Sequence, residues 1–320
     1  MPLHVVAIKM ATIPSRRVSL YFATLHATRP ILGSWEVTLF KALKELLGWV
    51  SGSGGNDRLD PTPSADILAR AEAGDAEAAN ELGLWYAEIQ PASRKAEFWF
   101  RRAADAGLAR AQYNLGVLTM RLGRTNESIG WFRLAVDGGW PSAAFALGSV
   151  LEEQGDRKGA VEAFETGAHR ECALSQDALG RLALEEETEA SYEAARYWSE
   201  KAAQQGYASA QTRLGTIFHE GLGVARDPQL AAWWFLQAAH QGHAGAQAMI
   251  GVASHLGVGL TANRLNAARW LLVSAAQGNP AARAYFPTVE AELTPDERLA
   301  LEEWIDREDR ERKAAKKGGA

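Results

Sequence analysis

The chain has 320 residues, of which 47% are hydrophobic and 23% charged, a composition that excludes an intrinsically disordered protein. Its net charge is −5, although residues 1–50 carry +4 and residues 306–317 carry +2, so the remaining body is strongly acidic. An acidic body repels phosphates, and we predict no nucleic-acid partner. The single cysteine, Cys172, excludes an internal disulfide, is expected to be a buried structural thiol, and favours a reducing compartment.

Residues 1–35 form a basic leader that contains no acidic residue. Within it, Ser15-Arg16-Arg17-Val18-Ser19-Leu20 resembles a twin-arginine export signal, but that motif prefers an aromatic residue where Ser19 stands. The apolar run that follows is short and lacks a small-x-small cleavage site. We therefore expect a disordered leader, or a misassigned start, on a cytoplasmic protein, with a periplasmic or exported protein as the alternative. No run of eighteen apolar residues occurs, so no transmembrane helix is expected.

Residues 36–50, EVTLFKALKELLGWV, place apolar side chains at helical spacing and predict an amphipathic helix. A Gly/Ser/Pro linker follows at 51–64. The helix has two interpretations: it caps the first repeat, or it docks weakly on a membrane surface or a partner. Lys41, Lys44 and Glu45 fall short of the strongly basic face typical of membrane-surface helices, which favours the cap.

Residues 65–292 repeat one phrase, most clearly in YASAQTRLG at 207–215 and HAGAQAMIG at 243–251. Its Leu-Gly dipeptide recurs at intervals of 32 to 36 residues, and a glycine stands eight residues before nearly every copy; only the fourth has Glu171 there instead. The dipeptides are Leu82-Gly83, Leu115-Gly116, Leu147-Gly148, Leu179-Gly180, Leu214-Gly215, the variant Ile250-Gly251 and a degenerate Phe286-Pro287.

A second landmark follows each dipeptide, an aromatic residue four positions before Ala or Ser. The pairs are Trp99/Ala103, Trp131/Ala135, Trp198/Ala202, Trp234/Ala238 and Trp270/Ser274; the third copy has Ala163 beside Phe164 instead. These spacings place one apolar stripe on each of two helices per repeat. The mid-helix glycines are expected to receive the tryptophan of the partner helix. Because one hairpin cannot bury its own apolar faces, we predict an all-α, right-handed solenoid of about six and a half stacked hairpins.

The pattern resembles the Sel1-like repeat, a relative of the tetratricopeptide repeat. The fifth copy carries all of its landmarks: Ala210, Gln211, Leu214, Gly215, Phe218, Gly221, Gly223, Val224, Asp227, Ala231, Trp234, Ala238, Ala239 and Gly242. In this copy Asp227 is expected to cap the second helix, with Pro228 at its first position. The resemblance implies a protein-interaction scaffold.

A C-terminal capping helix is predicted at 293–308, because Thr294, Pro295 and Glu297 form a helix-start signature. Its apolar residues can cover the exposed face of the last repeat. The charged tail at 309–320 is expected to fray.

The sequence contains no residue pattern typical of a catalytic, cofactor or metal site. His219 and His255 occupy equivalent positions in neighbouring repeats and would lie about one helix diameter apart, ~10 Å, too far to share a zinc ion. The sequence contains neither a G-x-S-x-G motif nor a phosphate-binding loop. We therefore predict a non-enzyme without cofactors.

The tetratricopeptide analogy implies that the first helix of each hairpin lines a concave groove, which would bind a protein or peptide partner. The residues expected in this groove are Asn80, Tyr113, Arg121, Phe145, Glu152, Glu153, Asp177, Arg181, Thr212, His219, Glu220 and His255. The alternative for Tyr113 and Phe145 is packing against the neighbouring repeat. The alternative function is an exported Sel1-like protein that binds or hydrolyses β-lactams, although this chain lacks the paired cysteines and the S-x-x-K motif of such proteins.

Overall fold

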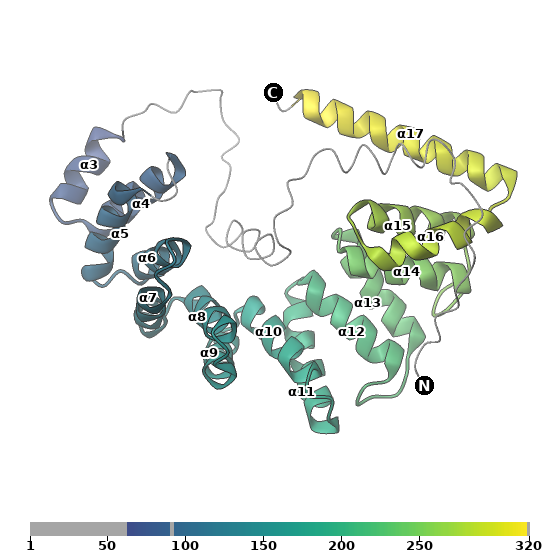
Figure 1. Ribbon diagram of the computed structural model, residues 1–320, viewed down its shortest axis with the longest axis horizontal. Coiled ribbons are helices and arrows are strands. Elements are labelled where there is room, and N and C mark those ends of the chain that lie inside the picture. Colours follow the sequence, from purple (N-terminus) through teal and green to yellow (C-terminus); the bar gives the residue numbers. More distant parts are fainter. Residues whose placement is uncertain (1–62, 90–92, 319–320) are drawn as a thin grey trace. The chain divides into compact units, whose positions relative to one another are not determined.

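A computed structural model describes residues 63–89 and 93–318, and every regular element in these ranges is an α-helix (Figure 1). In chain order the helices are α3 (Ala65–Glu72), α4 (Ala76–Ile89), α5 (Arg94–Asp105), α6 (Ala109–Arg121), α7 (Thr125–Asp137), α8 (Pro141–Glu153), α9 (Arg157–His169), α10 (Ala173–Leu184), α11 (Glu189–Gln204), α12 (Ala208–Glu220), α13 (Pro228–His240), α14 (Ala244–Leu256), α15 (Arg264–Ala276), α16 (Pro280–Glu292) and α17 (Pro295–Gly318). The predicted leader, the amphipathic helix at 36–50 and nearly all of the linker at 51–64 lie outside the described residues.

The described residues divide into two compact units, residues 63–185 with α3–α10 and residues 186–318 with α11–α17. In the first unit α4 pairs with α5, α6 with α7 and α8 with α9; in the second, α12 pairs with α13 and α14 with α15. Within each unit, consecutive hairpins also pack on each other through neighbouring helices such as α5 and α6 or α13 and α14. Stacked hairpins of this kind confirm the predicted all-α solenoid of repeats.

The turns between stacked helices depend on a left-handed residue at the helix end. Gly107 has φ +85°, and the amide of Leu108 after it donates to the carbonyl of Ala103, the pattern of a Schellman cap. Glu171, the residue that departs from the glycine pattern, adopts the same conformation at φ +60°. There Cys172, half-buried at the start of α10, donates its amide to the carbonyl of Gly167. The fourth repeat therefore keeps the turn at the cost of a strained residue.

The starts of the helices follow the predicted capping chemistry. Asp227 Oδ1 accepts a hydrogen bond of 2.9 Å from the amide of Leu230, with Pro228 at the first helical position. At the start of α17, Glu297 Oε2 accepts from the amide of Thr294 at 2.9 Å, and Thr294 Oγ1 accepts from the amide of Glu297 at 3.3 Å. Both predicted helix starts are confirmed, and each satisfies amides that would otherwise have no partner.

Each hairpin is closed by a bulky side chain that lies against the mid-helix glycine of its partner. Phe132 packs on Gly116 and is fully buried; a β-carbon on that glycine would approach the ring to 2.6 Å. Equivalent pairs are Phe100 on Gly83, Phe164 on Gly148, Phe235 on Gly215 and Leu271 on Gly251. The residue that packs on the glycine is therefore the one directly after the tryptophan position, and the expectation that the tryptophan itself packs there is wrong.

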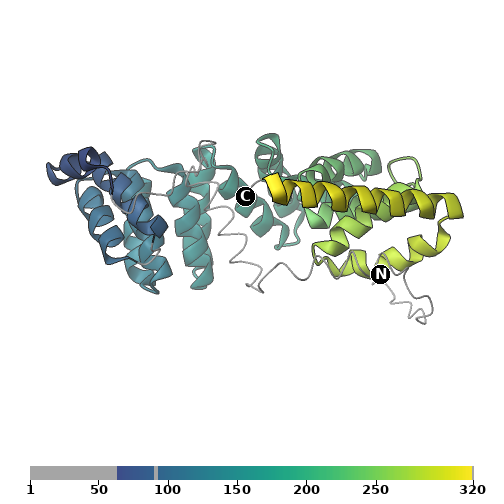
Figure 2. The ribbon, with the colours of Figure 1, turned by 90° about the horizontal axis from the view of Figure 1, so that it is seen from above.

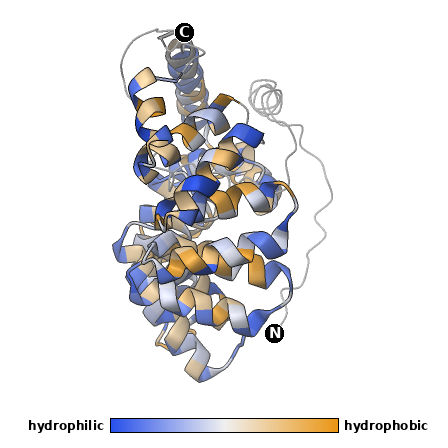
Figure 3. Ribbon diagram, turned by 90° about the vertical axis from the view of Figure 1, so that its left-hand side faces the viewer, coloured by the Kyte–Doolittle hydropathy of each residue, from blue (hydrophilic) through white to orange (hydrophobic). Residues whose placement is uncertain are grey.

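The tryptophans instead contribute to contacts between hairpins. Trp131, in α7, packs against the core cluster built by residues of α3 to α6. Trp270, in α15, likewise packs against the cluster of α13 and α14. Consecutive residues of a helix point about 100° apart, so the tryptophan and the residue after it face two different neighbours. Figure 3, coloured by hydropathy, shows hydrophobic and hydrophilic residues side by side on the same helices.

Helix α17 closes the second unit. Leu301 and Ile305 are buried in one cluster with Phe286 and Val289 of α16, as predicted for a capping helix. The helix, yellow in Figure 2, extends beyond the predicted 293–308 and continues to Gly318. Arg, Glu, Lys and Ala dominate this stretch, and all four are strong helix formers. Within the described residues, no helix combines the length and apolar character that crossing a membrane requires.

Candidate functional site

Two of the residues predicted to line the groove lie inside the protein. Asn80 is fully buried, and its Oδ1 accepts a 2.8 Å hydrogen bond from Asn114 Nδ2. Tyr113 is 2% exposed, with its ring centroid 5.9 Å from that of Phe132 and 6.3 Å from that of Trp140. Burial raises the pKa of its hydroxyl. The prediction that these two side chains meet a partner is wrong, because residues of their own and of the neighbouring hairpin cover them.

Other predicted residues connect the first helices of neighbouring hairpins. Arg181 Nη2 binds both carboxylate oxygens of Glu152, at 2.8 and 2.7 Å, and so joins α10 to α8. Thr212 Oγ1 lies 3.0 Å from His243 Nδ1 at the start of α14. His255 contacts the hydroxyl of Tyr285 at 2.8 Å. These side chains already have partners within the fold, so their polar groups contribute to stacking.

His255 also meets a carboxylate. Its Nε2 lies 3.0 Å from Glu292 Oε2, and this hydrogen bond, more than any other interaction, lowers the pKa of Glu292. His219 is half-buried and lies 3.6 Å from the exposed Glu220. In residues 63–89 and 93–318, no three His, Cys, Asp or Glu side chains are grouped closely enough to hold a metal ion.

Four predicted residues in the unit of residues 63–185 stay at least partly accessible, and we call them the first-helix surface: Arg121 of α6, Phe145 and Glu153 of α8, and Asp177 of α10. Phe145 is half-buried, and its ring centroid lies 5.9 Å from that of Phe164. Arg121 and Glu153 are exposed. Partial desolvation of its carboxyl and the neighbouring charge of Glu152 raise the pKa of Glu153.

The sequence prediction missed a recurring glutamine three residues before the Leu-Gly dipeptide. Gln247 Nε2 donates to the carbonyl of Ala239 at 3.1 Å, in the last turn of the preceding helix. The same bond, eight residues back, is made by Gln112, Gln176 and Gln211. Each of these carbonyls also accepts from the backbone amide three residues on, such as that of Gly242 for Ala239, and the buried glutamine supplies a second donor that ties the next helix to it. The signal was available, because the glutamine recurs at a fixed position.

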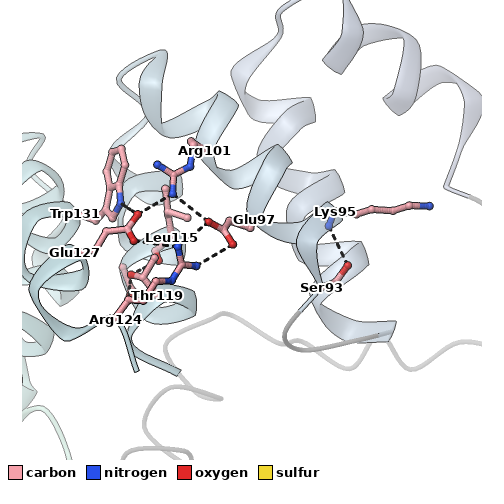
Figure 4. A network of polar contacts seen from close by, with 10 residues as sticks. Ser93, Lys95, Glu97, Arg101, Leu115, Thr119, Arg124, Glu127 and Trp131 are labelled. Atoms are coloured by element: carbon pink, nitrogen blue, oxygen red, sulfur yellow. Dashed lines mark hydrogen bonds and ion pairs between the residues drawn. The ribbon is translucent and has the colours of Figure 1, made fainter. Parts of the chain in front are cut away.

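A charged cluster joins α5 to α7 (Figure 4). Arg124 lies 2.8 Å from Glu97 and 3.0 Å from Glu127, and Arg101 lies 3.1 and 2.7 Å from the same two carboxylates. The hydrogen bond from Arg124 is the largest influence that lowers the pKa of Glu97. Burial would raise the pKa of Glu127, but hydrogen bonds from Arg101 and Trp131 lower it. With two cations for two anions, the cluster is balanced and clamps neighbouring hairpins together.

A groove opens in the unit of residues 186–318, between second helices α13 and α15 and beside α17. Two cavities of about 410 and 370 Å³ share Leu236, Asn266 and Trp270 among their lining residues. Trp304 borders the first cavity and Trp233 the second. Trp233 is 49% exposed, which is unusual for so large an apolar side chain. We call these five residues, together with Arg269, the tryptophan groove.

The family model of the Sel1 repeat matches residues 76–108, 109–140, 173–207, 208–243 and 244–279. The segment 141–172 between them, where Ala163 replaces the recurring aromatic residue, is not matched. No curated protein matches the chain.

Solved structures share the fold. The protective antigen c5321 of uropathogenic Escherichia coli, which displays an SLR fold, is 23% identical with a TM-score of 0.68 over 76% of this chain and 54% of that one. The chain thus spans about half the length of that relative. A Sel1 repeat protein from Oxalobacter formigenes is 20% identical with a TM-score of 0.42 over 95% of this chain and 94% of that one.

Proposed function

Because the chain belongs to the Sel1 repeat family, we propose that it is a non-catalytic scaffold that binds a protein or peptide partner on its first-helix surface. Repeats of this fold are generally protein-interaction scaffolds. Stacked hairpins hold side chains of successive helices at fixed intervals, and such a rigid array binds extended partners with little loss of entropy.

The observation that carries this proposal is the unbalanced charge of Glu153. Its neighbour Glu152 is neutralised by Arg181, but no cation among the described residues pairs with Glu153. Partial desolvation of its carboxyl and the like charge of Glu152 both disfavour its ionised form, although the side chain is exposed, and a lysine or arginine of a partner would reverse that effect. Phe145 on the same helix adds a half-buried aromatic surface, and aromatic residues are enriched at protein interfaces.

The test is affinity purification from the native cell with the full chain as bait. Glu153→Lys reverses the charge of a side chain that makes no ion pair, so we expect loss of the specific partner and a thermal unfolding midpoint close to that of the native protein. Glu165→Lys is the matched control, because Glu165 is exposed on the second helix α9 and makes no ion pair with any residue that the structure describes. Capture of the same partners by both variants and the native chain would contradict the proposal.

Two more obvious variants are unsuitable for this test. Tyr113→Ala would empty part of a packed core, since the side chain is 2% exposed. Changing Glu152 would leave Arg181 without its bidentate partner. Both changes would weaken the fold itself and would not isolate the surface.

A further inference from the structure

The tryptophan groove contains a cation that the fold leaves without an anion. Arg269 Nε is buried and has no hydrogen-bond acceptor among the described residues. The guanidinium carbon lies 5.9 Å from the ring centroid of Trp304. Burial, with a smaller contribution from the positive charge of Arg307, lowers the pKa of Arg269, and no carboxylate offsets these effects. A buried N–H without an acceptor costs about 1–3 kcal/mol, and the same side chain lines the larger cavity of the groove, where an anion can meet the positive charge.

The surroundings of Arg269 are mostly apolar and aromatic, with Asn266 as a polar neighbour in the lining of the same cavity. Its neighbour Trp270 lines both cavities of the groove, and the His240 ring stands edge-on to Trp270 with centroids 5.4 Å apart. Val273 and Leu236 complete the wall of the larger cavity. Its volume of about 410 Å³ lies within the range of ligand-binding pockets in proteins. The groove thus offers one positively charged side chain beside an apolar, aromatic surface.

We infer that the tryptophan groove binds an acidic peptide segment of a partner protein, in which an Asp or Glu is adjacent to a large apolar residue. The carboxylate binds Arg269, whose planar fork matches it, and the apolar side chain packs on Trp270 and Leu236. This surface lies on second helices of the unit of residues 186–318, whereas the first-helix surface belongs to the unit of residues 63–185. The inference therefore goes beyond the proposed function and does not depend on it.

The probes are three synthetic peptides, Gly-Ser-X-Leu-Phe-Ser-Gly with acetylated and amidated ends, in which X is Asp, Asn or Lys. Binding to the full ¹⁵N-labelled chain is followed through the indole N–H signals of Trp233, Trp270 and Trp304, each assigned by its Trp→Phe variant. We expect the Asp peptide to shift these signals and to bind about tenfold more tightly than the Asn peptide, the usual effect of a charge-assisted hydrogen bond. The Lys peptide is expected to bind most weakly.

Arg269→Gln is expected to remove the preference for Asp over Asn, because it keeps a donor and removes the charge. Arg264→Gln is the matched control on the same helix, since Arg264 is half-exposed and lies 3.6 Å from Glu292. This variant should keep the full preference. Glu153→Lys should also leave peptide binding unchanged, which separates this site from the first-helix surface.

Three results would overturn the inference. The first is an absence of indole shifts with 1 mM Asp peptide. The second is equal affinity for the Asp and Asn peptides, or an unchanged preference in Arg269→Gln. The third is concentration-dependent dimerisation of the native chain that Trp233→Ala abolishes, because the groove would then be occupied by a second copy.

Discussion

Gly116→Ala tests whether the hairpins close as the structure indicates. The added β-carbon would lie 2.6 Å from Phe132 Cε1 and 2.7 Å from Cδ1, where carbon atoms normally stay about 3.5–4.0 Å apart. Phe132 is fully buried, so its ring can move only by displacing other core side chains. Overpacking of this kind costs about 1–3 kcal/mol. The better helix propensity of alanine returns about 1 kcal/mol, so we expect a net loss of up to about 2 kcal/mol in unfolding free energy.

The control for this substitution lies in the partner helix. Gly130, in α7, would present its new β-carbon to open space, with nothing within 4 Å. Gly130→Ala should therefore raise the unfolding free energy by about 1 kcal/mol, because only the better helix propensity of alanine acts. Urea unfolding of the full chains, followed by circular dichroism, should place the midpoint of Gly116→Ala below that of the native protein and the midpoint of Gly130→Ala above it. A midpoint for Gly116→Ala at or above the native value would refute this packing.

Glu171→Gly should raise the unfolding free energy by about 0.5–1 kcal/mol, because it relieves a left-handed glutamate at φ +60°; an unchanged or lower thermal midpoint would contradict this. Gln247→Ala should lower it by about 0.5–1.5 kcal/mol, because the carbonyl of Ala239 loses its side-chain donor and keeps only the backbone amide of Gly242; urea unfolding with no change of midpoint would show that water replaces the side-chain amide. Glu97→Gln tests the charged cluster through the pH dependence of stability. Since the folded state lowers the pKa of Glu97, unfolding takes up a proton, and this part of the stability is present above the ordinary glutamate pKa of about 4.3 and is lost as pH falls below it. The midpoint of thermal unfolding should therefore fall less steeply between pH 7 and pH 3 in the variant than in the native chain. Equal slopes of midpoint against pH would contradict the stabilising role of the cluster.

Much of the fold was predictable because the repeat displays its own constraints. The Leu-Gly dipeptides, the glycines at helix ends and the cap at Asp227 each correspond to a local geometry that few other residues satisfy. The sequence could not assign the tryptophan and the residue after it to their separate neighbours. Helical periodicity places both residues on the apolar side, and only the stacking of hairpins directs Phe132 to its own partner and Trp131 to the preceding hairpin.

The candidate site was less predictable, for a related reason. Counting positions along a helix identifies the first-helix face, but it does not show how closely the next hairpin approaches. Tyr113 lies on that face and is nevertheless covered by Phe132 and Trp140. The tryptophan groove escaped prediction altogether. Trp233, Trp270 and Trp304 come from three separate helices, and no sequence spacing relates them.

Site-specific photo-crosslinking in the native cell tests the scaffold role most directly. A benzoylphenylalanine is introduced in place of Glu153 on α8 or, separately, in place of Glu165 on α9, and the cells are irradiated. We predict a discrete covalent adduct of the chain with one partner protein from position 153 and none from position 165. No adduct at either position, or the same adducts at both, would contradict partner binding on the first-helix surface.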